Sequence, residues 1–382
     1  MALLLLALSL ASFVTLCALR GAPMADLLVY RAEGAAVAHG TDLYGFTITE
    51  WRLPATYPPF AAILFVPASW LPAPVVKAAF LAGNALLLAV FVILSARLAA
   101  RSLPLPLPLL CTATAGALWL EPVFQTLLFG QINLVVACLA LWDLTRPPGA
   151  RAKGLALGIT AGIKLTPAVF VAYLLLRGRI REAATATAAF GATVALGAVL
   201  LPSASADFWT RRLYETGRVG KAWIVDNQSL RGLVARALGD PEPGLVWAVP
   251  AAAVAVTGLV LAARARRDSH GILLTAFTAL LICPISWTHH WVWCVPLLAV
   301  LLAEGRIRTA ALVALVFTAR TMWLVPHEGP LDLELPWWQQ PLAAAYPLVA
   351  LGLPFSCDAV ISRRPIVSTE PTEKPAPAPS PR

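Results

Sequence analysis

Two carboxylates in the sequence have the placement that acid–base chemistry needs. Asp26 opens the polar and apolar stretch 26–34, and Glu121 precedes Pro122 at a turn between two apolar runs. A carboxylate just outside an apolar segment can act as a general base. Asp26 has an alternative role as a helix N-cap, where an Asp side chain stabilises free amide groups by about 1 kcal/mol. The sequence alone leaves both roles open.

A lysine inside an apolar segment is the next candidate. Lys164 stands between Gly162 and Pro167 within the apolar run 154–176. A charged side chain among apolar residues is costly unless it is paired or faces water, so it indicates a functional site. A lysine beside a free helix end suits an anion such as a lipid phosphate. The alternative is that Lys164 pairs with a buried acid.

Hydrogen-bonding side chains gather at three further places. Gln131 and Asn133 offer amide groups suited to sugar hydroxyls. The link 202–243 contains a polar run from Asp226 to Arg231. His289 and His290 stand in a Trp-rich segment and could move a proton or bind phosphate. Because adjacent residues of a helix point to different faces, we expect one of the two histidines to face the site.

The composition indicates which elements must position these residues. The chain has 382 residues, of which 59% are hydrophobic and 13% charged, against about a quarter charged in a soluble domain. Its long apolar runs predict an all-α polytopic membrane protein with about 10 transmembrane helices. We expect one membrane domain over residues 1–361, with the first helix retained, and a disordered cytoplasmic tail over 362–382.

Short basic clusters separate the apolar runs and predict the topology. Lys and Arg favour the cytoplasmic side, yet clusters flank the run 154–176 at both ends. We therefore expect this run to enter and return as a re-entrant hairpin. By the same argument the short run 59–72 lies at the outer face. Both termini are then cytoplasmic, and the polar candidates collect on the outer face of a plasma membrane.

Several classes of function are disfavoured. The net charge of +9 arises from scattered clusters, which suit anionic lipid better than nucleic acid. No phosphate-binding loop or dinucleotide fingerprint is present, which argues against an ATP-driven machine. The six cysteines show no metal-ligand spacing. We expect no metal site and no cofactor.

The motifs together resemble a known family. They are Asp26-Leu-Leu-Val-Tyr30, Asp42-Leu-Tyr44, Tyr57-Pro-Pro-Phe60, Gly130-Gln-Ile-Asn133, Ile163-Lys-Leu-Thr-Pro167, Asn227-Gln-Ser-Leu230 and His289-His-Trp291. Their order is similar to that of the polyprenyl-phosphate-mannose-dependent α-mannosyltransferases of actinobacteria, glycosyltransferase family 87. The resemblance implies a GT-C-like bundle with re-entrant and juxtamembrane helices.

The resemblance also implies an activity and roles for residues. Mannose would pass with inversion from polyprenyl-phosphate-mannose to a lipid-linked mannan or phosphatidylinositol mannoside, forming an α-(1→2) link. Asp26 matches the family's base, and His289 or His290 its histidine. Lys164 and Arg231 would contact the donor phosphate. Contacts with sugar or acceptor are expected from Tyr57, Glu121, Gln131, Asn133, Asn227 and Gln228.

Other functions remain open at this point. A transporter or flippase for a lipid-linked or anionic substrate would also place a lysine at a broken helix. A related transferase could use another polyprenyl-phosphate sugar, and a non-catalytic scaffold would leave Lys164 unexplained. The acceptor, the oligomeric state and the pathway partners are not encoded in these patterns.

Overall fold

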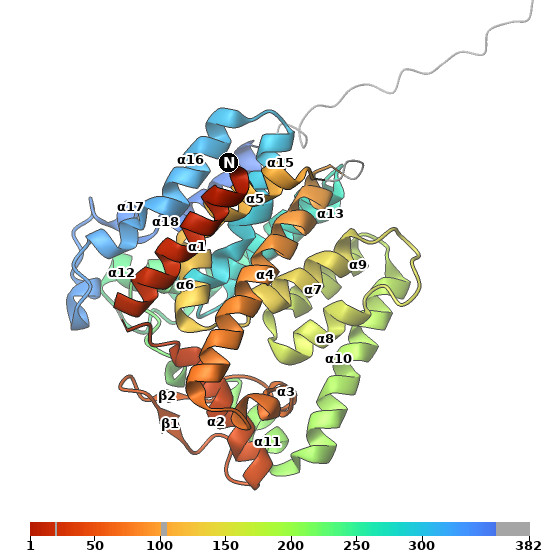
Figure 1. Ribbon diagram of the computed structural model, residues 1–382, viewed down its shortest axis with the longest axis vertical. Coiled ribbons are helices and arrows are strands. Elements are labelled where there is room, and N and C mark those ends of the chain that lie inside the picture. The colour runs from red at the N-terminus through yellow and green to blue at the C-terminus, as the bar shows by residue number, and fades with distance from the viewer. Residues whose placement is uncertain (20, 101–104, 357–382) are drawn as a thin grey trace, which may run out of the picture.

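The structure is a computed structural model that describes residues 1–19, 21–100 and 105–356 (Figure 1). Its described residues are mostly helical, with one two-stranded antiparallel ladder in which Thr47 of β1 pairs with Pro54 of β2. This confirms the predicted all-α class. The predicted tail, 362–382, and the domain boundary at 361 lie outside the described residues.

The elements follow one another along the whole described chain. In the first half they are α1 (Ala2–Leu19), α2 (Ala25–His39), β1 (Thr47–Ile48), β2 (Leu53–Pro54), α3 (Pro59–Ser69), α4 (Ala73–Ala99), α5 (Leu107–Ala117), α6 (Glu121–Phe129), α7 (Asn133–Thr145), α8 (Leu155–Ile163), η1 (Thr166–Ala168) and α9 (Val169–Leu176). In the second half they are α10 (Ile180–Leu200), α11 (Pro202–Asp207), η2 (Phe208–Arg212), η3 (Thr216–Arg218), α12 (Leu230–Leu238), α13 (Leu245–Arg264), α14 (Asp268–Ile282), η4 (Thr288–Trp293), α15 (Cys294–Ala303), α16 (Ile307–Ala319), η5 (Thr321–Leu324), η6 (Gly329–Leu333), α17 (Gln340–Ala343) and α18 (Ala345–Ser356).

Four helices of the described chain are long and apolar enough to cross a bilayer, namely α1, α4, α10 and α13. The helices α5 and α6 pass the same test together, although they bend by 76°. The described residues also form six shorter apolar helices of 10–17 residues. The prediction of about 10 crossings depends on these shorter helices and stays a prediction.

Prolines and glycines set many of the helix boundaries. Pro residues occupy the first turn of α3, α4, α5 and α6, where a missing N–H costs nothing. Gly130 ends α6 with a left-handed backbone (φ 67°), a conformation that residues with a side chain rarely adopt. The chain therefore turns sharply between Phe129 and Asn133.

The segment 154–176 forms the hairpin that the sequence predicts. A Cβ atom at Gly154 would lie 2.2 Å from the Glu182 carbonyl oxygen, and one at Gly158 would lie 2.2 Å from that of Ala186. Helix α8 therefore packs parallel to α10. Helix α9 must return to the end where it began, because only 177–179 join it to α10. The break falls at Lys164, whose backbone is extended, so Lys164 lies at the hairpin tip.

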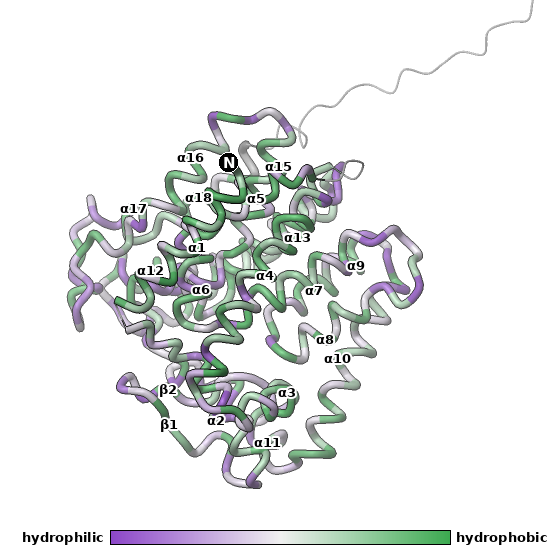
Figure 2. Tube along the Cα trace, in the orientation of Figure 1, coloured by the Kyte–Doolittle hydropathy of each residue, from purple (hydrophilic) through white to green (hydrophobic). Residues whose placement is uncertain are grey.

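The basic clusters meet at one end of the bundle. Lys153 forms an ion pair with Glu182 at 3.4 Å, and Arg177 and Arg179 both pair with Asp268. Arg97 shares a hollow with Arg267. Figure 2 shows hydrophilic links at the ends of predominantly hydrophobic helices. The basic residues of these described links therefore lie at one end of the bundle, and their cytoplasmic location stays a prediction.

The other end of the bundle holds the short elements. Helix α3 packs on α2 so closely that a Cβ atom at Gly34 would lie 2.3 Å from the Phe65 carbonyl oxygen. Figure 1 places α2, α3, α11 and the two strands together at this end, opposite the links between the hydrophobic helices. We call this group of α2, β1, β2, α3 and α11 the cap. The run 59–72 is thus part of the cap.

Candidate active site

A cavity of about 800 Å³ lies between the hairpin tip and the cap. Its walls come from four stretches that are distant in sequence: α2 with the following turn, the α6–α7 turn with the hairpin tip, the link 208–226, and the segment 279–290. The predicted site residues that line it are Asp26, Tyr57, Gln131, Lys164, His289 and His290. The structure therefore brings these six together in space.

Asp26 lies in the first turn of α2 and faces the cavity. The N-cap position belongs to Met24, which has a left-handed backbone, so the N-cap alternative for Asp26 is wrong. The pKa of Asp26 is raised to about 6, chiefly by burial; a hydrogen bond from Gln131 and the charge of Lys164 oppose this rise, and the nearby Asp226 adds to it. Asp26 is thus ionised at neutral pH yet close to its pKa, as suits a general base.

Two tyrosines fix the orientation of Gln131. The hydroxyls of Tyr30 and Tyr57 donate to its Oε1 at 2.8 and 3.2 Å. Because Oε1 is occupied by these donors, the Gln131 amide N–H groups are left to face the Asp26 carboxylate. Gln131 was predicted as a sugar contact; its geometry makes it a partner of Asp26.

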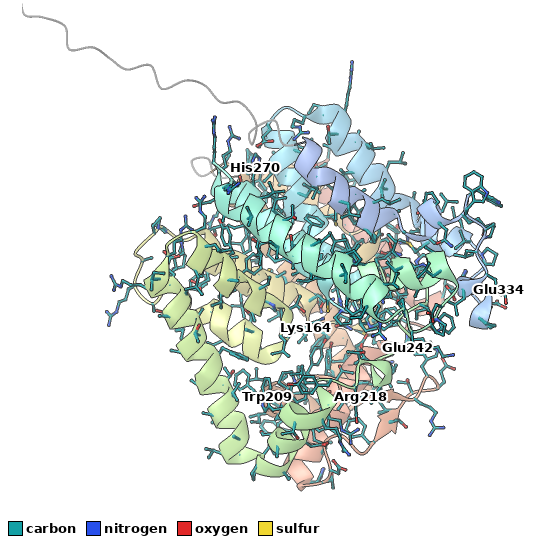
Figure 3. The ribbon with its side chains drawn as sticks, turned by 180° about the vertical axis from the view of Figure 1, so that it is seen from behind. Lys164, Trp209, Arg218, Glu242, His270 and Glu334 are labelled. Atoms are coloured by element: carbon teal, nitrogen blue, oxygen red, sulfur yellow. The ribbon has the colours of Figure 1, made fainter. Side chains whose placement is uncertain are left out.

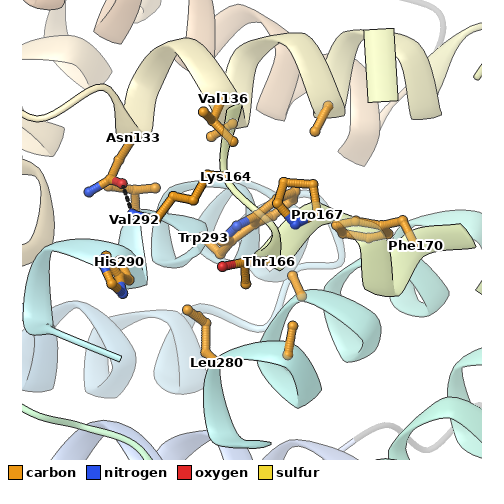
Figure 4. Close-up of a pocket in the computed structure, with 14 residues that line it drawn as sticks. Asn133, Val136, Lys164, Thr166, Pro167, Phe170, Leu280, His290, Val292 and Trp293 are labelled. Atoms are coloured by element: carbon orange, nitrogen blue, oxygen red, sulfur yellow. Dashed lines mark hydrogen bonds between the residues drawn. The ribbon is translucent and has the colours of Figure 1, made fainter. Parts of the chain in front are cut away.

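Lys164 is held by a chain of hydrogen bonds at the hairpin tip (Figure 4). Its ammonium donates to Asn133 Oδ1 at 2.9 Å, and Asn133 Nδ2 donates to the His289 carbonyl at 2.8 Å. The ammonium also lies 5.5 Å from the centre of the Tyr57 ring. In the described residues no carboxylate forms an ion pair with Lys164. The lysine therefore brings a positive charge to the cavity wall that interacts with Asp26 without a direct ion pair.

Both histidines line the cavity, so the expectation that only one would face it is wrong. They lie on η4, a tight helix with a kink at Trp291, and their rings meet edge to face at 4.7 Å. This departs from the α-helical spacing on which the expectation rested. Both ring nitrogens of His289 are buried without a hydrogen-bond partner. A buried unpaired imidazole is costly, which suits a group that meets a ligand.

Five of the predicted residues lie outside the lining of this cavity: Glu121, Asn133, Asn227, Gln228 and Arg231. Glu121 accepts hydrogen bonds from Tyr346 and Trp323, at 2.8 and 3.3 Å. Arg231 pairs with Glu242 at 2.7 Å. Asn227 and Gln228 are fully buried, and their side-chain amides form hydrogen bonds with backbone groups.

These two amides join separate segments. Asn227 Oδ1 accepts from the Ser286 amide at 2.8 Å, and Gln228 Nε2 donates to the Ala343 carbonyl at 2.7 Å. Asn133 is intermediate, because it lines a small pocket that adjoins Lys164 and His290. The amides 227 and 228 therefore hold the cavity wall together.

Comparison with known proteins decides the family. The model of glycosyltransferase family 87 matches residues 55–284. This chain belongs to glycosyltransferase family 87. The chain is 34% identical to the polyprenol-phosphate-mannose-dependent alpha-(1-2)-phosphatidylinositol mannoside mannosyltransferase of Mycobacterium tuberculosis, over 86% of this chain and 83% of that protein.

Two more relatives agree. A polyprenol-phosphate-mannose-dependent alpha-(1-2)-phosphatidylinositol pentamannoside mannosyltransferase of the same species is 36% identical, over 77% of this chain and 69% of that protein. A phosphatidylinositol mannoside mannosyltransferase of Mycolicibacterium smegmatis, also dependent on polyprenol-phosphate-mannose, is 34% identical over 84% of this chain and 80% of its own length. No solved structure matches.

The family 87 transferase also has cavity residues that sequence reasoning missed. Arg212, Arg218, Trp51 and Trp287 line the same walls. The loop that carries the two arginines contains several other basic residues, and nothing in their spacing distinguishes those that face inward. Asp226 also lines the cavity and accepts from the Thr288 hydroxyl at 2.7 Å.

The described residues of the transferase contain no cluster of three or more His, Cys, Asp or Glu side chains that could hold a metal ion. The charged groups that line the cavity are two carboxylates and three cations, namely Asp26, Asp226, Lys164, Arg212 and Arg218. Such an arrangement can remove a proton from one substrate while it stabilises negative charge on another.

Proposed function

We propose that this chain transfers mannose from polyprenol phosphate mannose to a hydroxyl of a phosphatidylinositol mannoside, with formation of an α-(1→2) link. The names of its relatives supply the substrates. The observation that carries the proposal is the position of Asp26 and Lys164 on the walls of one cavity. A carboxylate and a cation around a shared space are what this reaction requires.

The proposed reaction is a single displacement with inversion at the anomeric carbon. The acceptor oxygen forms a bond to that carbon while the bond to the phosphate oxygen breaks. Asp26 takes the acceptor proton, since burial leaves its pKa near 6 and Gln131 orients its carboxylate. The polyprenyl phosphate leaves with the electron pair.

Charge that develops on the leaving phosphate needs a positive partner. Lys164 supplies it from the hairpin tip, where Asn133 fixes the ammonium. His289 lies beside this region with unpaired ring nitrogens, which suits a hydrogen bond to phosphate or sugar. Fixed charges that face the developing charge are the main source of such stabilisation. We propose that the reaction needs no metal ion.

We further propose that the cavity opens on the extracytoplasmic side of the plasma membrane, with both termini in the cytoplasm. The basic links from the ends of α7, α9 and α13 gather at the opposite end of the bundle. Lys and Arg are enriched on the cytoplasmic side of membrane proteins, which supports this orientation.

The test compares purified wild-type protein with Asp26→Asn in detergent. Transfer of radiolabelled mannose from polyprenol phosphate mannose to a phosphatidylinositol mannoside is measured with and without EDTA. We expect EDTA to have no effect and Asp26→Asn to lower kcat by about 10²- to 10⁴-fold, the usual contribution of a general base.

The matched control is Asp240→Asn, which changes an exposed carboxylate outside the cavity lining. It should keep wild-type activity. Full activity of Asp26→Asn would remove Asp26 from the mechanism. Transfer from a different polyprenyl phosphate sugar, with none from the mannose donor, would contradict the proposed donor.

A further inference from the structure

Two arginines of the link 208–226 line the cavity, and their charges are balanced differently. Arg212 donates to Asp207 at 2.8 Å and to Glu215 at 3.3 Å, so carboxylates compensate it. Arg218 forms no ion pair with any carboxylate in the described part of the chain. Arg218 therefore brings a net positive charge to the wall.

The contacts of Arg218 leave part of its guanidinium unused. One terminal nitrogen donates to the Ala55 carbonyl, and the group lies 5.6 Å from the centre of the Tyr44 ring. Its Nε atom is buried and has no hydrogen-bond partner. A buried unsatisfied donor on a cation is costly, so a native structure that keeps one calls for an explanation.

The buried acid Glu33, whose charge interacts with Arg218, does not provide that explanation. Glu33 accepts from the Thr56 amide at 3.2 Å, while its other oxygen has no partner. Burial raises the pKa of Glu33 to about 8, so the side chain is mostly uncharged at neutral pH. The charge on Arg218 is thus left for a ligand.

Arg218 and Lys164 belong to different walls. Lys164 is at the hairpin tip, whereas Arg218 ends η3 beside the turn that follows the strands. Figure 3 shows Lys164 towards the middle of the molecule and Arg218 nearer the end formed by the cap. A cavity of about 800 Å³ has room for groups at both places.

We propose that Arg218 forms a second anion subsite, which binds the phosphodiester of the acceptor lipid. The inference rests on the proposed function, in which both substrates carry phosphate: the donor through its polyprenyl phosphate and the acceptor through its phosphatidylinositol. Lys164 then serves the donor and Arg218 the acceptor. An arginine can hold two phosphate oxygens at once, which fixes orientation as well as affinity.

The experiment crosses variants with two acceptors. One acceptor is a phosphatidylinositol mannoside, and the other is an uncharged alkyl mannoside that lacks phosphate. In Arg218→Gln we expect KM for the phosphodiester acceptor to rise about 10- to 100-fold, as for the loss of a charged hydrogen bond. KM for the uncharged acceptor, kcat with that acceptor and KM for the donor should stay at wild-type values.

Three controls separate this role from a structural one. Arg211→Gln changes an exposed arginine of the same link that does not line the cavity, and should leave both acceptors unaffected. Arg218→Lys should restore part of the affinity because it keeps the charge. Lys164→Gln should slow transfer to both acceptors alike, since it acts on the donor.

The composition of the host bilayer distinguishes binding of the acceptor by Arg218 from binding of bulk anionic lipid. In nanodiscs of phosphatidylcholine, the Arg218→Gln effect should equal that in nanodiscs that contain phosphatidylglycerol. A KM difference that appears only with phosphatidylglycerol would overturn the assignment to the acceptor. Equal losses for both acceptors in Arg218→Gln would also overturn it. If the wild-type protein transfers mannose to neither acceptor, the proposed function itself fails.

Discussion

At the scale of single residues, the partner of a polar side chain decides its role. Gln131 and Gln228 are both buried amides in polar motifs. The oxygen of Gln131 is taken by two tyrosines and its N–H groups face Asp26, whereas the amide of Gln228 is used by backbone groups. Only Gln131 can therefore influence the proposed base.

A pH profile tests this influence. The base must be ionised, so kcat/KM should fall about tenfold per pH unit below about 6 in the wild-type protein. Gln131→Met removes the donor that stabilises the carboxylate. The pKa of Asp26 then rises, and we expect the acidic limb to move up by about one pH unit, since a hydrogen bond to a charge is worth about 1.5–3 kcal/mol.

The same profile distinguishes the competing role. At pH 8 Asp26 is ionised in both proteins, so Gln131→Met should recover most of its activity there. A limb that does not move, together with a raised KM for the acceptor at every pH, would make Gln131 a sugar contact instead. Lys164 and Asp226 also act on Asp26, and both are unchanged in this variant.

The sequence predicted the residues of the site better than it predicted their contacts. Asp26 and Lys164 could be predicted because a charged side chain beside or within an apolar run is energetically costly and so indicates a function. Arg231 also follows a polar run beside an apolar helix, but it forms an ion pair with Glu242 at 2.7 Å, which neutralises its charge. Arg218 was missed because its uncompensated charge follows from the fold and has no sequence signal.

At the scale of elements, the position of Lys164 depends on close packing of α8 against α10. Gly158 lies in this contact, where a Cβ atom would meet the Ala186 carbonyl at 2.2 Å. Gly158→Ala should therefore force the helices apart and cost about 1–3 kcal/mol. We expect a lower Tm in detergent and a lower kcat, because the hairpin tip moves away from the cavity.

Gly191→Ala is the matched control for this substitution. Gly191 is also in a helix, α10, but a Cβ atom there would meet nothing within 4 Å. Alanine in a helix interior is favoured over glycine by about 0.5–1 kcal/mol, so Tm should stay equal or rise. If Gly158→Ala behaved like Gly191→Ala, the close packing would not be what holds the tip.

The elements were predictable where charge and composition agreed. Basic residues at both ends of 154–176, with glycines and Pro167 inside, indicated the hairpin. The sequence indicated a turn at Glu121, but it did not indicate that a helix, α6, follows this turn at 76° to α5. The spacing of an α-helix was expected for His289 and His290, whereas the structure has a tight helix with a kink at Thr288–Trp293, and both histidines line the cavity.

At the scale of the whole molecule, charge is distributed along one direction. The basic links meet at one end, and the predicted site residues meet near the other. The sequence predicted this separation, since it follows from which links carry Arg and Lys. The number of crossings is harder to predict, because several helices, such as the 13-residue α7, are too short to be judged by length alone.

The orientation can be tested by labelling cysteines introduced at the two ends. Thr41→Cys lies just beyond α2 at the cavity end, and Ala152→Cys lies in the basic link before α8; both positions are exposed. A membrane-impermeant maleimide added to intact cells should label Thr41→Cys and should reach Ala152→Cys only after lysis. The unsubstituted chain gives the background from its native cysteines. The reverse pattern would place the cavity on the cytoplasmic side. The lipid-linked mannose donor would then have to be present in the cytoplasmic leaflet.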